Sequence, residues 1–450
     1  MSNVAPGEWE QAHSSSVQAL DRDISPKDVR RAVTAATVGT LIEWFDYALY
    51  GAAAGLVINK LYFPQFSEAG GVLAAFATFA VGFFARPLGG VLLSHMGDKV
   101  GRKPALILSI ALMGIATVGF GLLPTYAQIG IWAPILLVLF RLIQGFGAGA
   151  ELAGAITLVA EYAPADKRAF YTAIPGAAPV AGIALATLCF YGVSLLPEED
   201  LLGWAWRVPF LLSGVLFVVA LYIRRRLDET PAYVAAMDKA QQRKTEESVP
   251  LKLLLKNSPR ELILGCLSVT GHNANAYILS AFALSYMTNT LAMSRADSLL
   301  VMTVSCLVAV VTTPAMGALA DKWGHGKVFA LGAAFAILYA YPFFALLGMK
   351  TVGTSIIAMS LGYGIAFSAM AGAQGAFLTN LFPTRYRFSG LTIARELNGV
   401  VIAGPTPFIA AYLVSVSGGQ PTYVALFVMA CCAVTVLAVA LGNRLSYARD

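Results

Sequence analysis

Long apolar runs alternate with short polar breaks from about residue 31 to residue 443, and this alternation predicts helices that cross a membrane. A spanning helix needs about 20 apolar residues, and twelve runs come close to that length or exceed it. We place them at residues 31–58, 68–96, 104–123, 131–160, 168–196, 205–226, 259–290, 298–320, 327–348, 352–381, 386–414 and 421–443. The expected fold class is therefore an all-α integral membrane protein with twelve transmembrane helices.

The longest polar interruption lies between the sixth and seventh spans and divides the chain into halves of six spans. The loops repeat across this division. GDKVGRK (97–103) after the second span matches ADKWGHGK (320–327) after the eighth, and EYAPADKR (161–168) after the fourth matches NLFPTRYR (380–387) after the tenth. Two related halves are typical of transporters, which hold their substrate between the halves near the middle of the membrane.

Lysine and arginine gather on one side of the predicted membrane. Of the 31 basic residues, 24 lie in the two tails, the central interruption and the other loops after even-numbered spans, whereas four lie on the opposite side. Loops rich in basic residues stay in the cytoplasm, so both termini are expected there. Five regions follow: a disordered cytoplasmic tail at 1–29, a six-helix bundle at 30–226, a cytoplasmic linker at 227–258, a second six-helix bundle at 259–445 and a tail at 446–450.

The composition excludes an ordinary soluble enzyme, because 58% of residues are hydrophobic and only 12% are charged. The net charge of +6 follows from the loop bias, so no nucleic-acid partner is expected. The five cysteines lie in apolar runs without CxxC spacing, and no HExxH, GxGxxG, Walker or GxSxG motif occurs. We therefore expect no enzyme, metal or cofactor. The expected partners are a small organic solute, protons and the lipid bilayer, with a monomer as the functional unit.

Several motifs follow one another in a specific order: GTLIEWFDYALYG (39–51), FARPLGG (84–90), RLIQGFGAGAELAGA (141–155) and FPTRYRFSG (382–390). Together with the repeated loops, they resemble the major facilitator superfamily, and within it the metabolite:proton symporter family of shikimate, 2-oxoglutarate and proline/betaine transporters. The resemblance implies two six-helix bundles in a bacterial inner membrane, alternating access between its two sides, and proton-driven import of small organic solutes.

The sequence departs from the family pattern in the region that handles substrate. Val269 and His272 stand where close relatives have an arginine and an acidic residue, and Arg395 with Glu396 replaces a Tyr-Gln pair. Asn380 also replaces an expected glutamate. Because of the first departures, the substrate of this chain cannot be inferred from the family. The replacement at Asn380 suggests a weaker cytoplasmic contact in the second half.

Charged side chains inside the hydrocarbon are costly and are therefore functional candidates. Asp46 in the first span and Arg141 in the fourth are predicted at the same depth, and Glu43 shares a helix face with Asp46. A carboxylate changes its proton affinity when a neighbouring guanidinium withdraws. Proton coupling is therefore expected at Asp46, Glu43, Arg141 and Glu151. Static ion pairs that only hold helices together are the alternative.

Arg395 lies at mid-depth in the eleventh span, and its neighbour Glu396 points about 100° away from it on a helix. We expect a substrate carboxylate to bridge Arg395 and Arg141, one from each half. The full set of substrate-binding candidates is Arg141, Arg395, Arg86, Glu396, His272, Asn273, Asn275, Tyr277 and Gln374. The expected function is a proton-coupled symporter of a small organic acid; a zwitterion symporter or a proton/solute antiporter are the alternatives.

Two further features are expected to shape the helices and their cytoplasmic contacts. Gly145 and Gly149 lie four residues apart and permit close contact with a neighbouring helix. The resemblance implies that Asp98 faces the start of the eleventh helix, that Arg102 pairs with Glu161, and that such contacts lock the outward-open state. The expected cytoplasmic gate comprises Asp98, Arg102, Glu161, Arg168, Asp321 and Arg387.

Overall fold

A backbone inside hydrocarbon must satisfy its own hydrogen bonds, and helices achieve this within one segment. The computed structural model describes residues 26–100, 102–149, 159–160, 162–226, 258–382 and 387–445. The regular elements in these ranges are helices, and no strand occurs among them. Eight helices are long and apolar enough to cross a membrane, and three shorter apolar helices accompany them. The expected all-helical fold class is thereby confirmed.

The helices follow the predicted spans closely. The first bundle contains α2 (Pro26–Ala53), α4 (Glu68–Val100), α5 (Arg102–Leu122), α7 (Trp132–Ala148), α9 (Arg168–Ser194) and α11 (Val208–Arg226). The second bundle contains α14 (Pro259–Ser268), α15 (Thr270–Tyr277), α17 (Arg295–Trp323), α18 (His325–Gly348), α19 (Val352–Leu361), α20 (Ser368–Leu381), α21 (Arg387–Asn398), α22 (Thr406–Val416) and α23 (Thr422–Gly442). Short helices at one end are α6 (Tyr126–Ile129) and α10 (Glu198–Gly203).

The predicted tail and the described part of the first helix overlap by four residues. The tail was expected to reach residue 29, and the described part of α2 starts at Pro26. The expected tail at 1–25, nearly all of the expected linker at 227–258 and the last residues 446–450 lie outside the described residues.

Wider π-helical turns interrupt several spans, and the apolar pattern did not predict them. They lie at Ala54–Ile58, Ile278–Phe282, Tyr286–Thr290, Gly362–Phe367 and Gly399–Ala403. Such turns change the direction of the side chains that follow and often lie at functional sites. The last one separates α21 from α22, so the helix that carries Arg395 and Glu396 is not continuous with its outer half.

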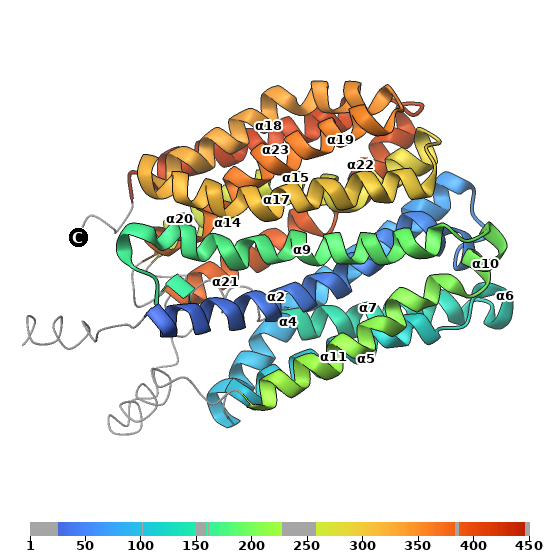
Figure 1. Ribbon diagram of the computed structural model, residues 1–450, viewed down its shortest axis with the longest axis horizontal. Coiled ribbons are helices and arrows are strands. Elements are labelled where there is room, and N and C mark those ends of the chain that lie inside the picture. The colour runs from blue at the N-terminus through green and yellow to red at the C-terminus, as the bar shows by residue number, and fades with distance from the viewer. Residues whose placement is uncertain are drawn as a thin grey trace, which may run out of the picture.

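The two bundles lie side by side, with α9 and α17 adjacent between them (Figure 1). The start of α2 and the end of α23 lie at the left in Figure 1, at what we call the terminal end. The short helices α6 and α10 lie at the right, at what we call the loop end. Exposed apolar side chains such as Val311 and Leu338 cover the sides of the bundles, as expected for surfaces that contact lipid.

Glycines bring α4 and α7 into backbone contact. A Cβ atom on Gly145 would overlap the carbonyl oxygen of Gly82, and one on Gly149 would overlap that of Arg86. The close contact expected from Gly145 and Gly149 is thereby confirmed. This contact sets the distance between the helices that carry Arg86 and Arg141.

Gly145→Ala should therefore destabilise the protein, because the new methyl group forces α7 away from α4. Overpacking of this kind costs about 1–3 kcal/mol. Thermal unfolding of the purified protein measures the effect. Gly192→Ala is the matched control, since a Cβ atom at Gly192 in α9 meets no atom within 4 Å. Equal unfolding temperatures for the two variants would contradict the packing argument.

Candidate functional site

Aromatic rings from both bundles meet at the middle of the molecule. Tyr277 of α15 contacts Phe83 and Phe79 of α4, with ring centroids 5.4 and 6.0 Å apart. It also contacts Trp44 of α2 at 6.1 Å. Tyr47 packs edge-on against Phe83 at 5.6 Å. We call Trp44, Tyr47, Phe79, Phe83 and Tyr277 the aromatic layer. Of the predicted substrate residues, Tyr277 therefore lies at the junction of the two bundles.

An ion pair beside the aromatic layer joins the two bundles inside the membrane region. Arg86 of α4 donates from Nε to Glu396 Oε2 at 3.2 Å and from Nη2 to Glu396 Oε1 at 3.4 Å. Its Nη2 also lies 3.7 Å from Glu43 Oε1 of α2. The side chains of Arg86, Glu396 and Glu43 are 8%, 17% and 2% exposed. Arg86 therefore lies between one carboxylate from each bundle.

Arg395 has a neutral partner, unlike Arg86. Its Nη1 donates to Gln374 Oε1 of α20 at 2.5 Å. Among the described residues, no carboxylate forms an ion pair with Arg395, because the adjacent Glu396 points toward Arg86. The structure thus brings together Arg395 and Gln374 from the predicted substrate set, while Glu396 forms its ion pair with Arg86 and acts on Arg395 through its charge.

The polar residues of α15 divide into two groups. Asn273 donates to Asn398 Oδ1 at 2.6 Å, and Asn398 donates to Thr270 Oγ1 at 2.9 Å, so Asn273 ties α15 to α21. His272 stacks on Phe367 with centroids 5.1 Å apart. The buried Nδ1 of His272 and Nδ2 of Asn275 find no hydrogen-bond partner in the described part of the chain. These two residues keep hydrogen-bonding capacity that Asn273 has already used.

The sequence predicted that Arg141 directly affects the proton affinity of Asp46, and this prediction needs correction. The carboxylate of Asp46 accepts a hydrogen bond from Ser213 of α11, and the two described charges form no ion pair with each other. Arg141 instead donates to Gln144 and to the carbonyl oxygen of Phe79. Gln144 lies between the two charges, because its Nε2 contacts the backbone oxygen of Asp46 at 3.4 Å.

Arg141 contacts groups of the first bundle, and its predicted substrate bridge to Arg395 stays a prediction. Its guanidinium carbon lies over the rings of Tyr50, Tyr47 and Phe79 at 4.2, 4.8 and 4.8 Å, and the side chain is fully buried in the first bundle. These cation–π contacts and the hydrogen bond to the Phe79 carbonyl oxygen stabilise the positive charge of the Arg141 guanidinium. The sequence offered a partial indication of Gln144, three residues after Arg141, but none of Ser213 within its apolar run.

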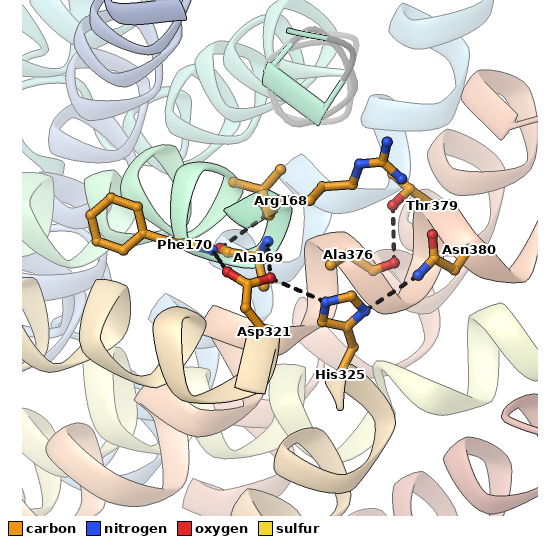
Figure 2. A network of polar contacts seen from close by, with 9 residues as sticks. Arg168, Ala169, Phe170, Asp321, His325, Ala376, Thr379 and Asn380 are labelled. Atoms are coloured by element: carbon orange, nitrogen blue, oxygen red, sulfur yellow. Dashed lines mark hydrogen bonds and ion pairs between the residues drawn. The ribbon is translucent and has the colours of Figure 1, made fainter. Parts of the chain in front are cut away.

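Asp321 joins the bundles at the terminal end (Figure 2). Its carboxylate oxygens accept hydrogen bonds from the backbone nitrogens of Ala169 and Phe170, both at 2.9 Å, in the first turn of α9. The positive end of the helix dipole favours a carboxylate there. His325 Nε2 lies 3.3 Å from the same carboxylate, and Asn380 lies 3.3 Å from His325 Nδ1.

The structure describes only some of the other residues predicted for the cytoplasmic gate. Arg168 begins α9 beside this network, as Figure 2 shows. The side chains of Asp98, Arg102 and Arg387, and the whole of Glu151 and Glu161, lie outside the part of the chain that the structure describes. The helix-start contact expected for Asp98 is seen at its counterpart in the second repeat, Asp321.

A second contact joins the bundles at the loop end. The Glu198 carboxylate of α10 forms ion pairs with two residues. Its Oε1 lies 3.0 Å from Lys60 Nζ of the first bundle and 2.5 Å from Arg295 Nη2 of α17 in the second bundle. Hydrogen bonds from Lys60 and Arg295 hold the pKa of the Glu198 carboxyl below its ordinary value. Asn289 also donates to the backbone oxygen of Gly55 at 3.0 Å, across the two bundles.

Metal binding has no support among the described residues, which contain no group of three or more His, Cys, Asp or Glu placed to hold an ion.

Comparison with known proteins gives consistent results. A family model described as Major Facilitator Superfamily matches residues 36–403. The shikimate transporter of Escherichia coli (strain K12) is 37% identical over 420 residues, which cover 92% of this chain and 94% of that protein. A proline/betaine transporter of Salmonella typhimurium is 36% identical over 396 residues, which cover 86% of this chain and 78% of that protein. The crystal structure of a D-xylose-proton symporter matches with a TM-score of 0.70 at 19% identity, covering 92% of this chain and 97% of that one.

Glu198→Gln should loosen the loop end. Because the pKa of Glu198 is lowered, its carboxylate stabilises the contact between the bundles fully above the ordinary pKa of about 4.3. This stabilisation is lost as the pH falls through the lowered pKa. Because the pair is exposed, the open population should rise by less than about fivefold at neutral pH. The difference from the unaltered protein should disappear as the pH falls through the lowered pKa of Glu198.

Spin labels at Gln65 and Gln420, exposed in loops of the two bundles, report the distance between the bundles at this end. Glu199→Gln, at the next residue, is the control. If Glu198→Gln and Glu199→Gln shift the distances equally, or if the Glu198→Gln effect persists in acid, Glu198 does not hold the bundles together.

Proposed function

This chain belongs to the Major Facilitator Superfamily, and from that premise we propose that it is a proton-coupled symporter that imports a small organic acid by alternating access. It is a membrane transporter and not an enzyme. The names of the shikimate and proline/betaine transporters among its relatives support a small organic solute as the cargo. The proton gradient as the driving force belongs to the proposal.

The orientation of the protein in the membrane is part of this proposal. The excess of basic residues in the tails and even-numbered loops supports a cytoplasmic terminal end and an inner-membrane location. The loop end, with Lys60 and Arg295, then faces outward. In this orientation, the contacts of Asp321 would close the cytoplasmic side and those of Glu198 the outer side.

The observation that carries the proposed cargo is the state of Arg395. Its side chain is partly buried near the junction of the bundles, and its hydrogen-bond partner among the described residues is a neutral amide, Gln374. A guanidinium forms two charge-assisted hydrogen bonds with a carboxylate, and both are strengthened away from water. The Nε2 of Gln374 is buried and finds no partner among the described residues, so it offers a further hydrogen bond to an acid.

A zwitterion such as an amino acid or a betaine is the alternative cargo. One observation favours it: the aromatic layer presents the rings of Trp44, Tyr47, Phe83 and Tyr277 close together. The faces of such rings attract a quaternary ammonium. A zwitterion would place its ammonium at this layer and its carboxylate at Arg395.

Uptake into proteoliposomes with an imposed pH gradient tests the function. We expect accumulation of at least one acid among shikimate, 2-oxoglutarate and related hydroxy acids, and collapse of accumulation when the gradient is dissipated. Glycine betaine and proline test the alternative in the same assay. Absence of gradient-driven accumulation for all these solutes would contradict proton-coupled import of this class.

Arg395→Lys should weaken binding of the accumulated acid by roughly tenfold or more, because lysine keeps the charge but loses the forked geometry. The amide analogue of that acid should bind poorly to the unaltered protein. Arg260→Lys, an exposed site at the start of α14, is the matched control. Normal acid binding by Arg395→Lys, or equal binding of acid and amide, would show that Arg395 does not receive the carboxylate.

A further inference from the structure

We infer that Glu396 is the group that takes up the coupled proton, because Glu396 and the substrate carboxylate compete for Arg86. This inference rests on the proposed function and deepens it. Glu396 occupies Arg86 in the structure through two hydrogen bonds, at 3.2 and 3.4 Å. It thereby makes the kind of paired contact that an incoming carboxylate would make.

The formal charges around this ion pair already balance. Glu43, Arg86, Arg395 and Glu396 contribute two negative and two positive charges at the junction of the bundles. An organic anion that enters alone leaves a net negative charge in a region of low dielectric, which is unfavourable. An anion that enters with one proton leaves the cluster neutral. The cluster therefore favours entry of one proton for each carboxylate.

Protonation of Glu396 also provides the binding site. A neutral carboxyl group loses the charge-assisted part of its contact with Arg86, so the guanidinium becomes available. The substrate carboxylate then lies between Arg86 of the first bundle and Arg395 of the second. Arg86 thus takes the bridging role that the sequence suggested for Arg141, whose cation is held by rings within the first bundle.

Several groups face Glu396 and limit the choice of proton acceptor. Arg86 from α4, Tyr277 from α15 and Arg395 on its own helix interact with Glu396 directly, and Glu43 and Tyr47 from α2 interact with Arg86 beside it. Glu43 is the only other carboxylate of this described set. It lies in the same bundle as Arg86, at 3.7 Å, so a proton on Glu43 leaves the contact between the bundles intact. A proton on Glu396 weakens that contact.

The local backbone suits such an exchange. The π-helical turn Gly399–Ala403 begins three residues after Glu396 and separates α21 from α22. The segment therefore lets α21 change direction without moving α22. When the acid leaves on the other side, Glu396 releases its proton there and pairs with Arg86 again. One proton and one carboxylate enter, and both leave.

The experiment counts protons taken up during binding. Shikimate is added to the purified full-length protein in weakly buffered detergent solution with a pH-indicator dye. We expect one proton taken up per shikimate bound by the unaltered protein above neutral pH, and an affinity that falls about tenfold per pH unit on the alkaline side. Glu396→Gln should still bind shikimate, without proton uptake and with less than about twofold change per pH unit.

Two matched variants and one ligand analogue make this result specific. Glu68→Gln, at an exposed residue of the helix that carries Arg86, should retain the linked proton. Glu396→Asp should retain it as well, since the carboxylate remains; this variant also guards against a folding defect in Glu396→Gln. Shikimate methyl ester, which lacks the charge, should bind to the unaltered protein more weakly than shikimate and without proton uptake.

The inference is overturned if Glu396→Gln still takes up one proton per shikimate, or if the linked proton disappears in Glu43→Gln or Asp46→Asn and persists in Glu396→Gln. If shikimate does not bind, the acid accumulated in the proteoliposome screen replaces it as the probe. Failure of the proposed function is distinguishable, because then the unaltered protein accumulates no acid. Gradient-driven accumulation with proton uptake independent of Glu396 would overturn only the present inference.

Discussion

The ion pair between Arg86 and Glu396 is the contact on which the centre of this transporter depends. It links α4 of the first bundle to α21 of the second at a depth where water is scarce. A single charge there would be strongly unfavourable, but the bidentate geometry satisfies both groups. The glycine contacts between α4 and α7 and the rings of the aromatic layer hold Arg86 in the position that this pairing requires.

The three described arginines of the membrane region have different surroundings. Arg86 has carboxylates. Arg141 is fully buried and has the Gln144 amide, the Phe79 carbonyl oxygen and aromatic faces. Arg395 is partly exposed and has the Gln374 amide. Of the three, Arg395 combines a partly exposed side chain with the absence of an ion-paired carboxylate among the described residues, which leaves capacity for an additional anion. The difference in partners, and not the number of arginines, therefore distinguishes a substrate group from a structural one.

The two ends of the molecule hold the bundles together by different physical means. At the terminal end, Asp321 binds backbone amides at the start of α9, a contact that depends on helix position more than on side-chain charge. At the loop end, Glu198 binds the long side chains of Lys60 and Arg295 in an exposed setting, which salt and acid weaken. Since α9 and α17 pack along each other between these ends, changes at either end act on the same pair of helices.

The sequence by itself determined the spans, their number and the membership of the family, because the apolar length needed to cross a membrane and the repeated loops are local properties. It also identified Arg86, Arg395, Glu396, Gln374 and Tyr277 as candidates, since polar groups in apolar runs are conspicuous. Only the tertiary structure decided which of these side chains contact one another. Arg86 and Glu396 are 310 residues apart, and Ser213 reaches Asp46 across 167 residues, so neither contact has a local pattern. Depth along a helix is readable from sequence, whereas the direction of a side chain depends on π-helical turns and on packing against other helices, and these arise only when the whole chain has folded.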